Sequence, residues 1–243
     1  MNIHDLLIID KEDVQLSDLF LPEKIKNEVD QLLEEHQYVS DLLAYNLPVN
    51  NKILLNGHSG CGKTSTAKAI ANILQKPIYI LNLSNVICAR IGETSQNIKQ
   101  IFEKAAREKA ILFLDEFDQI GKARGNDDKD VGEMRRLVNT LIQLIDYFPA
   151  DALLIAATNH LEIIDYALIR RFQIKIDFPL PSQQELDGYY SHLLSRFPSQ
   201  LQEIERRYNI SYAEAKDITF TQLKAKLIAQ IKESKRDKNV IGL

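Results

Sequence analysis

The chain has 243 residues, of which 45% are hydrophobic and 26% are charged, and its formal net charge is -4. This balance is ordinary for a globular protein, and it argues against a surface built to coat nucleic acid or a membrane. Two cysteines are too few for a disulfide framework or a four-cysteine zinc site, so we expect free thiols in a reducing compartment. No apolar run approaches the roughly 18 residues that span a bilayer, and the first residues lack the pattern of a signal peptide, so we expect a cytoplasmic protein.

Helical and strand patterns alternate along the first three quarters of the chain. Apolar residues at helical spacing predict helices over 22–36, 39–43, 63–74, 93–109 and 134–145. Continuous apolar runs predict buried strands over 52–55, 78–83, 110–114 and 152–157, and the alternating residues 173–178 predict an exposed edge strand. The charged stretch 122–133 reads as an exposed loop. Strands that alternate with helices indicate a parallel sheet covered on both faces.

The pattern changes near Pro181, after which every segment reads as helical. The helices expected there cover 182–195, 199–207, 211–217 and 219–235, and the charge-rich residues 232–239 read as a solvated helix end. We therefore divide the chain into an N-terminal segment (1–20), an α/β core (21–181) and a small helical domain (182–243).

A glycine-rich stretch joins the first strand to the next helix. Its sequence fits the pattern G-x-x-x-x-G-K-T. Glycines allow the main-chain N–H groups to turn inward around a polyphosphate, Lys63 can reach the outer phosphates, and the Thr64 hydroxyl can bind Mg2+. The positive end of the following helix also favours an anion. A turn without function is the alternative, but the flanking strand and helix favour a nucleotide site made by Gly57, His58, Ser59, Gly60, Cys61, Gly62, Lys63, Thr64 and Ser65.

Two adjacent carboxylates end the strand over 110–114. Asp115 is suited to hold Mg2+ together with Thr64, and Glu116 can polarise a water molecule that attacks the terminal phosphate. Such a pair is also a common structural strand end. After a phosphate-binding loop, however, it indicates hydrolysis as well as binding.

Polar residues also follow the strand over 152–157. Asn159 is predicted to orient the attacking water, although Thr158 or Asn159 could instead cap a helix. Farther on, Arg170 and Arg171 follow an apolar turn. They are either part of a solvated surface or arginine fingers that act on the nucleotide of a neighbouring subunit.

Taken in order, these motifs resemble those of AAA+ ATPases of the AAA subgroup. The correspondence includes Walker A (57–64), Walker B (111–116), sensor 1 (156–159) and the arginine segment (165–172) followed by 177–181. Residues 16–20 are similar to the family segment that packs on adenine, which makes Leu19 and Phe20 candidate nucleotide contacts. Residues 92–94 and 135–141 look like the family's pore-facing loop and the helix after Walker B. The resemblance covers about residues 14–220.

The resemblance implies a three-layer αβα P-loop fold, with a parallel sheet in the order 5-1-4-3-2 and a small helical lid over the adenine. It also implies ATP and Mg2+ as cofactors. The protein would form a homo-oligomeric ring, usually a hexamer, with ATP between subunits and Arg170 and Arg171 acting in trans.

The sequence departs from the family pattern at three places. Arg170 and Arg171 are adjacent, where the family commonly has Pro-Gly between them, so the principal finger is left open. Arg90 stands where the pore loop usually has an aromatic residue, which leaves polypeptide threading unsupported. The lid is short and lacks an evident sensor 2 arginine; 211–213 is only faintly similar to the small-residue segment that replaces it.

Three functions remain as hypotheses. The preferred one is a ring-forming ATPase that remodels proteins or complexes, acting with a separately encoded partner such as a protease. The second is a nucleotide-gated assembly switch that threads nothing, which Arg90 favours. The third is a DNA-acting ATPase, for which the sequence offers no basic cluster.

Overall fold

A computed structural model describes residues 7–9, 12–84, 91–122 and 128–240. By its internal contacts the chain divides into two compact units. The first contains Met1–Gly57 and Gly62–Phe178, and the second contains His58–Cys61 and Pro179–Leu243. In the parts of the chain that the structure describes, no helix is long and apolar enough to cross a membrane.

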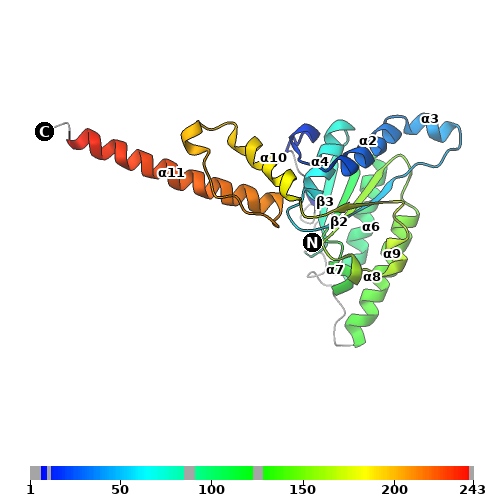
Figure 1. Ribbon diagram of the computed structural model, residues 1–243. Coiled ribbons are helices and arrows are strands. Elements are labelled where there is room, and N and C mark those ends of the chain that lie inside the picture. Colours follow the sequence, from blue (N-terminus) through cyan, green and yellow to red (C-terminus); the bar gives the residue numbers. More distant parts are fainter. Residues whose placement is uncertain (1–6, 10–11, 85–90, 123–127, 241–243) are drawn as a thin grey trace. The chain divides into compact units, whose positions relative to one another are not determined.

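The first unit is built on a six-stranded sheet (Figure 1). Five strands are parallel, in the order β3-β4-β5-β2-β6. When β2 to β6 are numbered 1 to 5 along the chain, this is the predicted order 5-1-4-3-2 read from the other edge. Their bounds are β2 Lys52–Gly57, β3 Ile78–Asn82, β4 Ile111–Asp115, β5 Leu153–Thr158 and β6 Ile174–Phe178. The sixth strand, β1 (Leu7–Ile9), was not predicted and pairs antiparallel with β3. The expected P-loop α/β fold is therefore confirmed, with one added edge strand.

Helices cover the two faces of this sheet (Figure 1). On one face α2 (Glu23–Gln37) packs against β6, and α4 (Lys63–Ile73) packs against β4 and β5. On the other face α6 (Ile91–Arg107) and α8 (Asp128–Asp146) enclose the main apolar cluster together with alternate residues of β4 and β5. The remaining elements of the unit are η1 (Leu16–Asp18), α3 (Val39–Ala44), α7 (Gln119–Lys122), η2 (Leu161–Ile163) and α9 (Tyr166–Ile169).

The arrangement of β2 determines where the glycine loop begins. β2 lies between β5 and β6, and its last residues pair with the last residues of both neighbours. Because the carboxyl ends of parallel strands share one edge of the sheet, the residues that follow β2, β4 and β5 come out close together. The fold thus assembles the three predicted motifs at one edge.

The second unit contains α10 (Gln183–Leu194), η3 (Ser199–Leu201) and α11 (Tyr212–Val240). The predicted helix over 199–207 is wrong beyond Leu201, because tertiary hydrogen bonds hold the following segment in another conformation. The Gln222 side chain binds both the N–H and the carbonyl of Glu205, and the Tyr190 hydroxyl binds the main chain of Arg207.

Two further predictions of segments need correction. The helices expected over 211–217 and 219–235 are one helix, α11. It continues through Thr219 because Ala215, Thr219 and Leu223 form one buried face at helical spacing. The Thr219 hydroxyl donates to the carbonyl of Ala215 at 2.7 Å, so it is buried with a partner. The loop expected over 122–133 is too long, since α8 begins at Asp128. A polar composition does not by itself distinguish the first turn of a helix from a loop.

Candidate functional site

The glycine loop has the backbone conformation that its motif requires. Gly57, Gly60 and Gly62 have φ angles of 139°, 74° and 100°. A side chain on Gly57 would place its Cβ 2.0 Å from the carbonyl oxygen of Phe178 on β6. Glycine is therefore needed here both for the backbone angle and for the close approach of two strands.

The middle of the loop packs within the second unit. His58 and Ser59 are exposed and Cys61 is buried. The carbonyl of Gly60 accepts a hydrogen bond from the N–H of Ala213, at the start of α11. These contacts also explain why residue 60 is glycine, since a Cβ there would lie 2.6 Å from Oγ of Ser211 and 2.8 Å from Cβ of Ala213.

Lys63 lies at the first position of α4, directly after Gly62. Its side chain is buried, and its Nζ donates to the carbonyl of Gly57 at 2.7 Å and to Oδ1 of Asn159 at 2.8 Å. The ammonium group is thus fixed by the end of β2 on one side and by the residue after β5 on the other. Thr64 and Ser65 are half-buried in the first turn of the same helix.

Asp115 ends β4, and the structure brings it into the electrostatic field of Lys63. Burial raises the pKa of the Asp115 carboxyl; the charges of Glu116 and Asp118 also raise it, while the N–H of Glu116 and the charge of Lys63 lower it. The carboxylate accepts that N–H at 2.9 Å. A carboxyl whose charge is opposed by burial and by neighbouring acids gains from a nearby cation.

Asp115 and Thr64 fit the requirements of Mg2+. Among the described residues, no group of three His, Cys, Asp or Glu side chains could hold a metal alone. Mg2+ does not need such a cage, because it is commonly bound by one or two protein oxygens, water and substrate phosphates. The carboxylate of Asp115 and the hydroxyl of Thr64 supply oxygens of the required kind.

Glu116 has an unusual backbone and a side-chain partner that the sequence did not indicate. Its φ angle is 54°, in the left-handed region where residues other than glycine are uncommon. Its carboxylate accepts a hydrogen bond from the hydroxyl of Ser84, and the N–H of Ser84 is held by the Asn82 side chain at the end of β3. Ser84 lies 32 residues from Glu116, and no local pattern connects the two.

Asp118 is a second residue that the sequence prediction missed. Its side chain is 2% exposed, and its Oδ1 accepts from the hydroxyl of Thr158 at 3.1 Å and from the N–H of Asn159 at 3.4 Å. Thr158 in turn accepts the N–H of His160 at 3.0 Å. Asp118 therefore fixes the main chain on which Asn159 is presented to Lys63. The cue in the sequence was a third acid in the run Asp115 to Asp118.

The two arginines differ in their surroundings. Arg171 is tied down within its own chain: its Nε lies 3.0 Å from a carboxylate oxygen of Asp146, and its guanidinium also binds the carbonyl of Ala167. Arg170 caps the C-terminus of α9 and its side chain is exposed.

The remaining candidate residues are Leu19, Phe20 and Arg90. Leu19 and Phe20 are half-buried directly after η1, which packs against α4, and neighbouring Leu21 lies beside Gly62. This places the segment at the N-terminus of α4. Arg90 lies outside the described residues.

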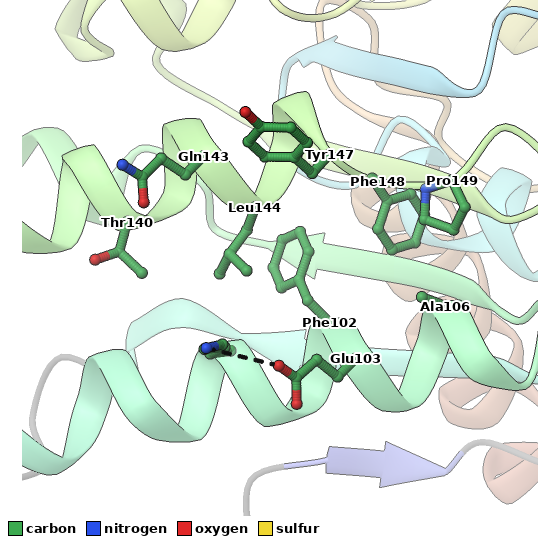
Figure 2. A pocket seen from close by; sticks show the side chains of 10 residues that line it. Phe102, Glu103, Ala106, Thr140, Gln143, Leu144, Tyr147, Phe148 and Pro149 are labelled. Carbon is green, nitrogen blue, oxygen red and sulfur yellow. Dashed lines mark ion pairs between the residues drawn. The ribbon is translucent and has the colours of Figure 1, made fainter.

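A separate cavity of about 320 Å3 lies between α6 and α8 (Figure 2). Its walls are mostly apolar, and they include Phe102, Leu144 and Phe148. A Lys99–Glu103 ion pair lies on α6 at its edge. None of the predicted site residues lines this cavity, so we do not assign it to the nucleotide site.

Comparison with known proteins agrees with the motifs. The family described as "ATPase family associated with various cellular activities (AAA)" matches residues 53–180. An uncharacterized AAA family ATPase, y4kL, from Sinorhizobium fredii is 31% identical over 212 residues, which cover 86% of this chain and 64% of that protein. A putative cell division cycle ATPase from Plasmodium falciparum is 34% identical over 191 residues, covering 76% of this chain and 15% of that protein.

A third relative is a putative 26S proteasome regulatory subunit homolog from Methanothermobacter thermautotrophicus. It is 32% identical over 136 residues, covering 55% of this chain and 36% of that protein. The chain thus matches less than two thirds of the length of each of these relatives. The family match spans more than half of this chain and includes the glycine loop, both carboxylates, Asn159 and both arginines. The chain belongs to the AAA family of ATPases.

Proposed function

We propose that the protein binds ATP with Mg2+ and hydrolyses it to ADP and phosphate, as one subunit of a homo-oligomeric ring that remodels proteins or protein complexes. The observation that carries the catalytic part is the position of Lys63, whose ammonium group is held between the end of β2 and Asn159 and interacts with Asp115. This arrangement joins three separate chain segments at one edge of the sheet, where a nucleotide phosphate would bind.

Each residue has a defined task in this proposal. The main-chain N–H groups of the glycine loop bind the phosphates, Lys63 neutralises their charge, and Leu19 and Phe20 contact the base. Asp115 and Thr64 would hold Mg2+, which would supply positive charge against the negative charge of the phosphates. Glu116 accepts a proton from the attacking water, which Asn159 orients.

Arg170 is our candidate for the principal finger. A finger must reach a phosphate of another subunit, and Arg170 is exposed. The guanidinium of Arg171 is already bound to Asp146 and Ala167, and withdrawing it would break these contacts. Arg171 is better suited to hold the end of α9 in place.

The remodelling role rests on similarity alone. One relative is named as a putative 26S proteasome regulatory subunit homolog, which favours a protein substrate and a separately encoded partner, such as a protease, for this chain as well. A nucleotide-gated assembly switch without threading is the alternative, and it depends on Arg90.

Substitution of Glu116 with glutamine tests the catalytic proposal. The variant should bind a fluorescent ATP analogue as the unmodified protein does but should not turn over ATP. Turnover at the normal rate would remove Glu116 from its proposed role. The same variant, loaded with ATP, can be used to capture a protein partner, because it would remain in the ATP-bound state.

Mixed assemblies test whether Arg170 acts on the nucleotide of a neighbouring subunit. A subunit with Arg170→Ala should be inactive alone and should recover activity when mixed with a Lys63→Ala subunit, because some interfaces then combine an intact loop with an intact finger. Confirmed mixed assembly without recovery would argue against action in trans. The matched variant Arg171→Ala should lower thermal stability, and Arg170→Ala should not.

A further inference from the structure

Exposed apolar side chains concentrate in two short segments. Among the residues that the structure describes, ten large apolar side chains are exposed, and seven of them fall within residues 38–47 and 227–231. We call Tyr38, Leu43, Tyr45 and Leu47 the hairpin patch, and we call Leu227, Ile228 and Ile231 the helix stripe. Scattered exposed apolar residues are ordinary, but clusters usually mark an interaction surface.

The helix stripe lies on the distal part of α11. Leu223 is buried, whereas no side chain from Lys224 to Glu233 is, and the stripe residues are 45% to 52% exposed. Figure 1 shows α11 continuing well beyond the other helices of its unit. An isolated helix is only marginally stable in water, so this extension would gain from packing its apolar side against another surface.

The hairpin patch lies where α2 meets α3 and continues into the turn before β2. Tyr45 is 81% exposed, the largest value in the patch. The surrounding sequence is strongly acidic: between Lys26 and Lys52 there is no lysine or arginine, and there are five acids, Glu28, Asp30, Glu34, Glu35 and Asp41.

The charge around the helix stripe is opposite. Lys224 and Lys232 are exposed beside the stripe. Contrary to our expectation of no basic cluster, the sequence has six basic residues and two acidic ones from residue 224 to residue 238. The two surfaces therefore match in both properties that matter for association, since each combines apolar side chains with charges of the sign that the other attracts.

We propose that the helix stripe of one protein molecule packs against the hairpin patch of a second copy. Both surfaces are exposed in the folded chain. The contact joins two different surfaces, so we propose that it is head-to-tail and not exchanged reciprocally between two copies; repetition of it then builds either a closed ring or an open filament. The inference builds on the homo-oligomeric part of the proposed function, and it does not depend on ATP hydrolysis.

The test uses two variants of exposed residues, which should fold normally. The stripe variant carries Leu227→Gln, Ile228→Gln and Ile231→Gln, and the patch variant carries Tyr38→Gln and Tyr45→Gln. Mass measured by light scattering over a range of concentrations should show self-association weakened by about 100-fold or more in each. Tyr147→Gln is the matched control, because Tyr147 is 87% exposed but lies outside both surfaces.

Mixing decides whether the contact joins two molecules. Each variant alone should be monomeric, and an equimolar mixture should form a dimer and stop there, because only one stripe and one patch remain intact. Monomers in the mixture, with an unchanged far-UV spectrum, would overturn the proposal, as would an unmodified protein that stays monomeric at all concentrations.

Charge reversal adds an independent readout. Glu34→Lys with Asp41→Lys should weaken assembly, and Lys224→Glu with Lys232→Glu in the partner molecule should restore it. Binding of a fluorescent ATP analogue should be unchanged in every variant, so loss of assembly is distinguished from failure of the nucleotide site. If the stripe instead binds phosphatidylserine vesicles while the mass stays unchanged by its substitution, it is a membrane contact and the proposal is wrong.

Discussion

Replacement of Asp118 with alanine should weaken both the fold and the presentation of Asn159. The buried carboxylate accepts the Thr158 hydroxyl at 3.1 Å and the N–H of Asn159 at 3.4 Å. A hydrogen bond to a charged group contributes about 1.5–3 kcal/mol, and the longer of these two contacts is weak. We therefore expect the free energy of unfolding to fall by about 2–3 kcal/mol, or roughly 4–12 °C in Tm for a chain of this size.

The same change should slow hydrolysis. Without Asp118, the segment that carries Asn159 loses its anchor, and small misplacements of a positioned group cost up to about 100-fold in rate. We expect kcat to fall by about 10-fold to 100-fold while the affinity for ATP changes much less, because the glycine loop is untouched. Asp118→Asn keeps an acceptor oxygen, so its kcat should lie between those of Asp118→Ala and the unmodified protein.

The assays are thermal unfolding and steady-state release of phosphate. Asp30→Ala is the control, since Asp30 is an exposed acid on α2. The reasoning is refuted if Asp118→Ala unfolds within about 1 °C of the unmodified protein and keeps more than about half of its kcat.

Three further predictions concern other parts of the molecule. Burial lowers the pKa of His36, so the free energy of unfolding should be highest above about pH 6.5 and should decrease as the pH falls below that value. Chemical unfolding at two pH values measures this difference. His36→Gln should reduce it, and an equal pH dependence in the variant and the unmodified protein would contradict the prediction. Gly57→Ala should cost at least about 3 kcal/mol, because it combines backbone strain with a clash against β6, whereas Gly132→Ala, with open space around its Cβ, should leave thermal stability equal or higher. Ser84→Ala should free the Glu116 carboxylate and change kcat at constant nucleotide affinity; a change in affinity alone would count against this assignment.

The parts of the fold that the sequence predicted are those with strong local signals. The buried strands have three or more consecutive apolar residues, and the glycines of the loop indicate the positive φ angles that the structure shows. β1 was missed because Leu7–Ile9 is too short to show a period. The break expected near Ile218 does not occur, because Ala215, Thr219 and Leu223 form a buried face that holds α11 continuous.

The missed parts of the site are contacts between distant segments. Ser84 with Glu116, Asp118 with Thr158, and Arg171 with Asp146 join residues 25 to 40 positions apart. Each depends on how a strand end or a helix end packs, which no local pattern encodes. For the same reason, the sequence could name both arginines but could not tell them apart.

The two edges of the sheet have features that disfavour strand pairing between copies of this protein. At one border the described part of β1 is Leu7–Ile9, which offers a short template for an added strand. At the other border β6 presents Lys175 and Asp177 to solvent. Charged residues and short edges are the usual protection against uncontrolled strand pairing. Strand addition at either border is therefore disfavoured, which leaves side chains on helices and turns, as in the contact that we propose, for association between molecules.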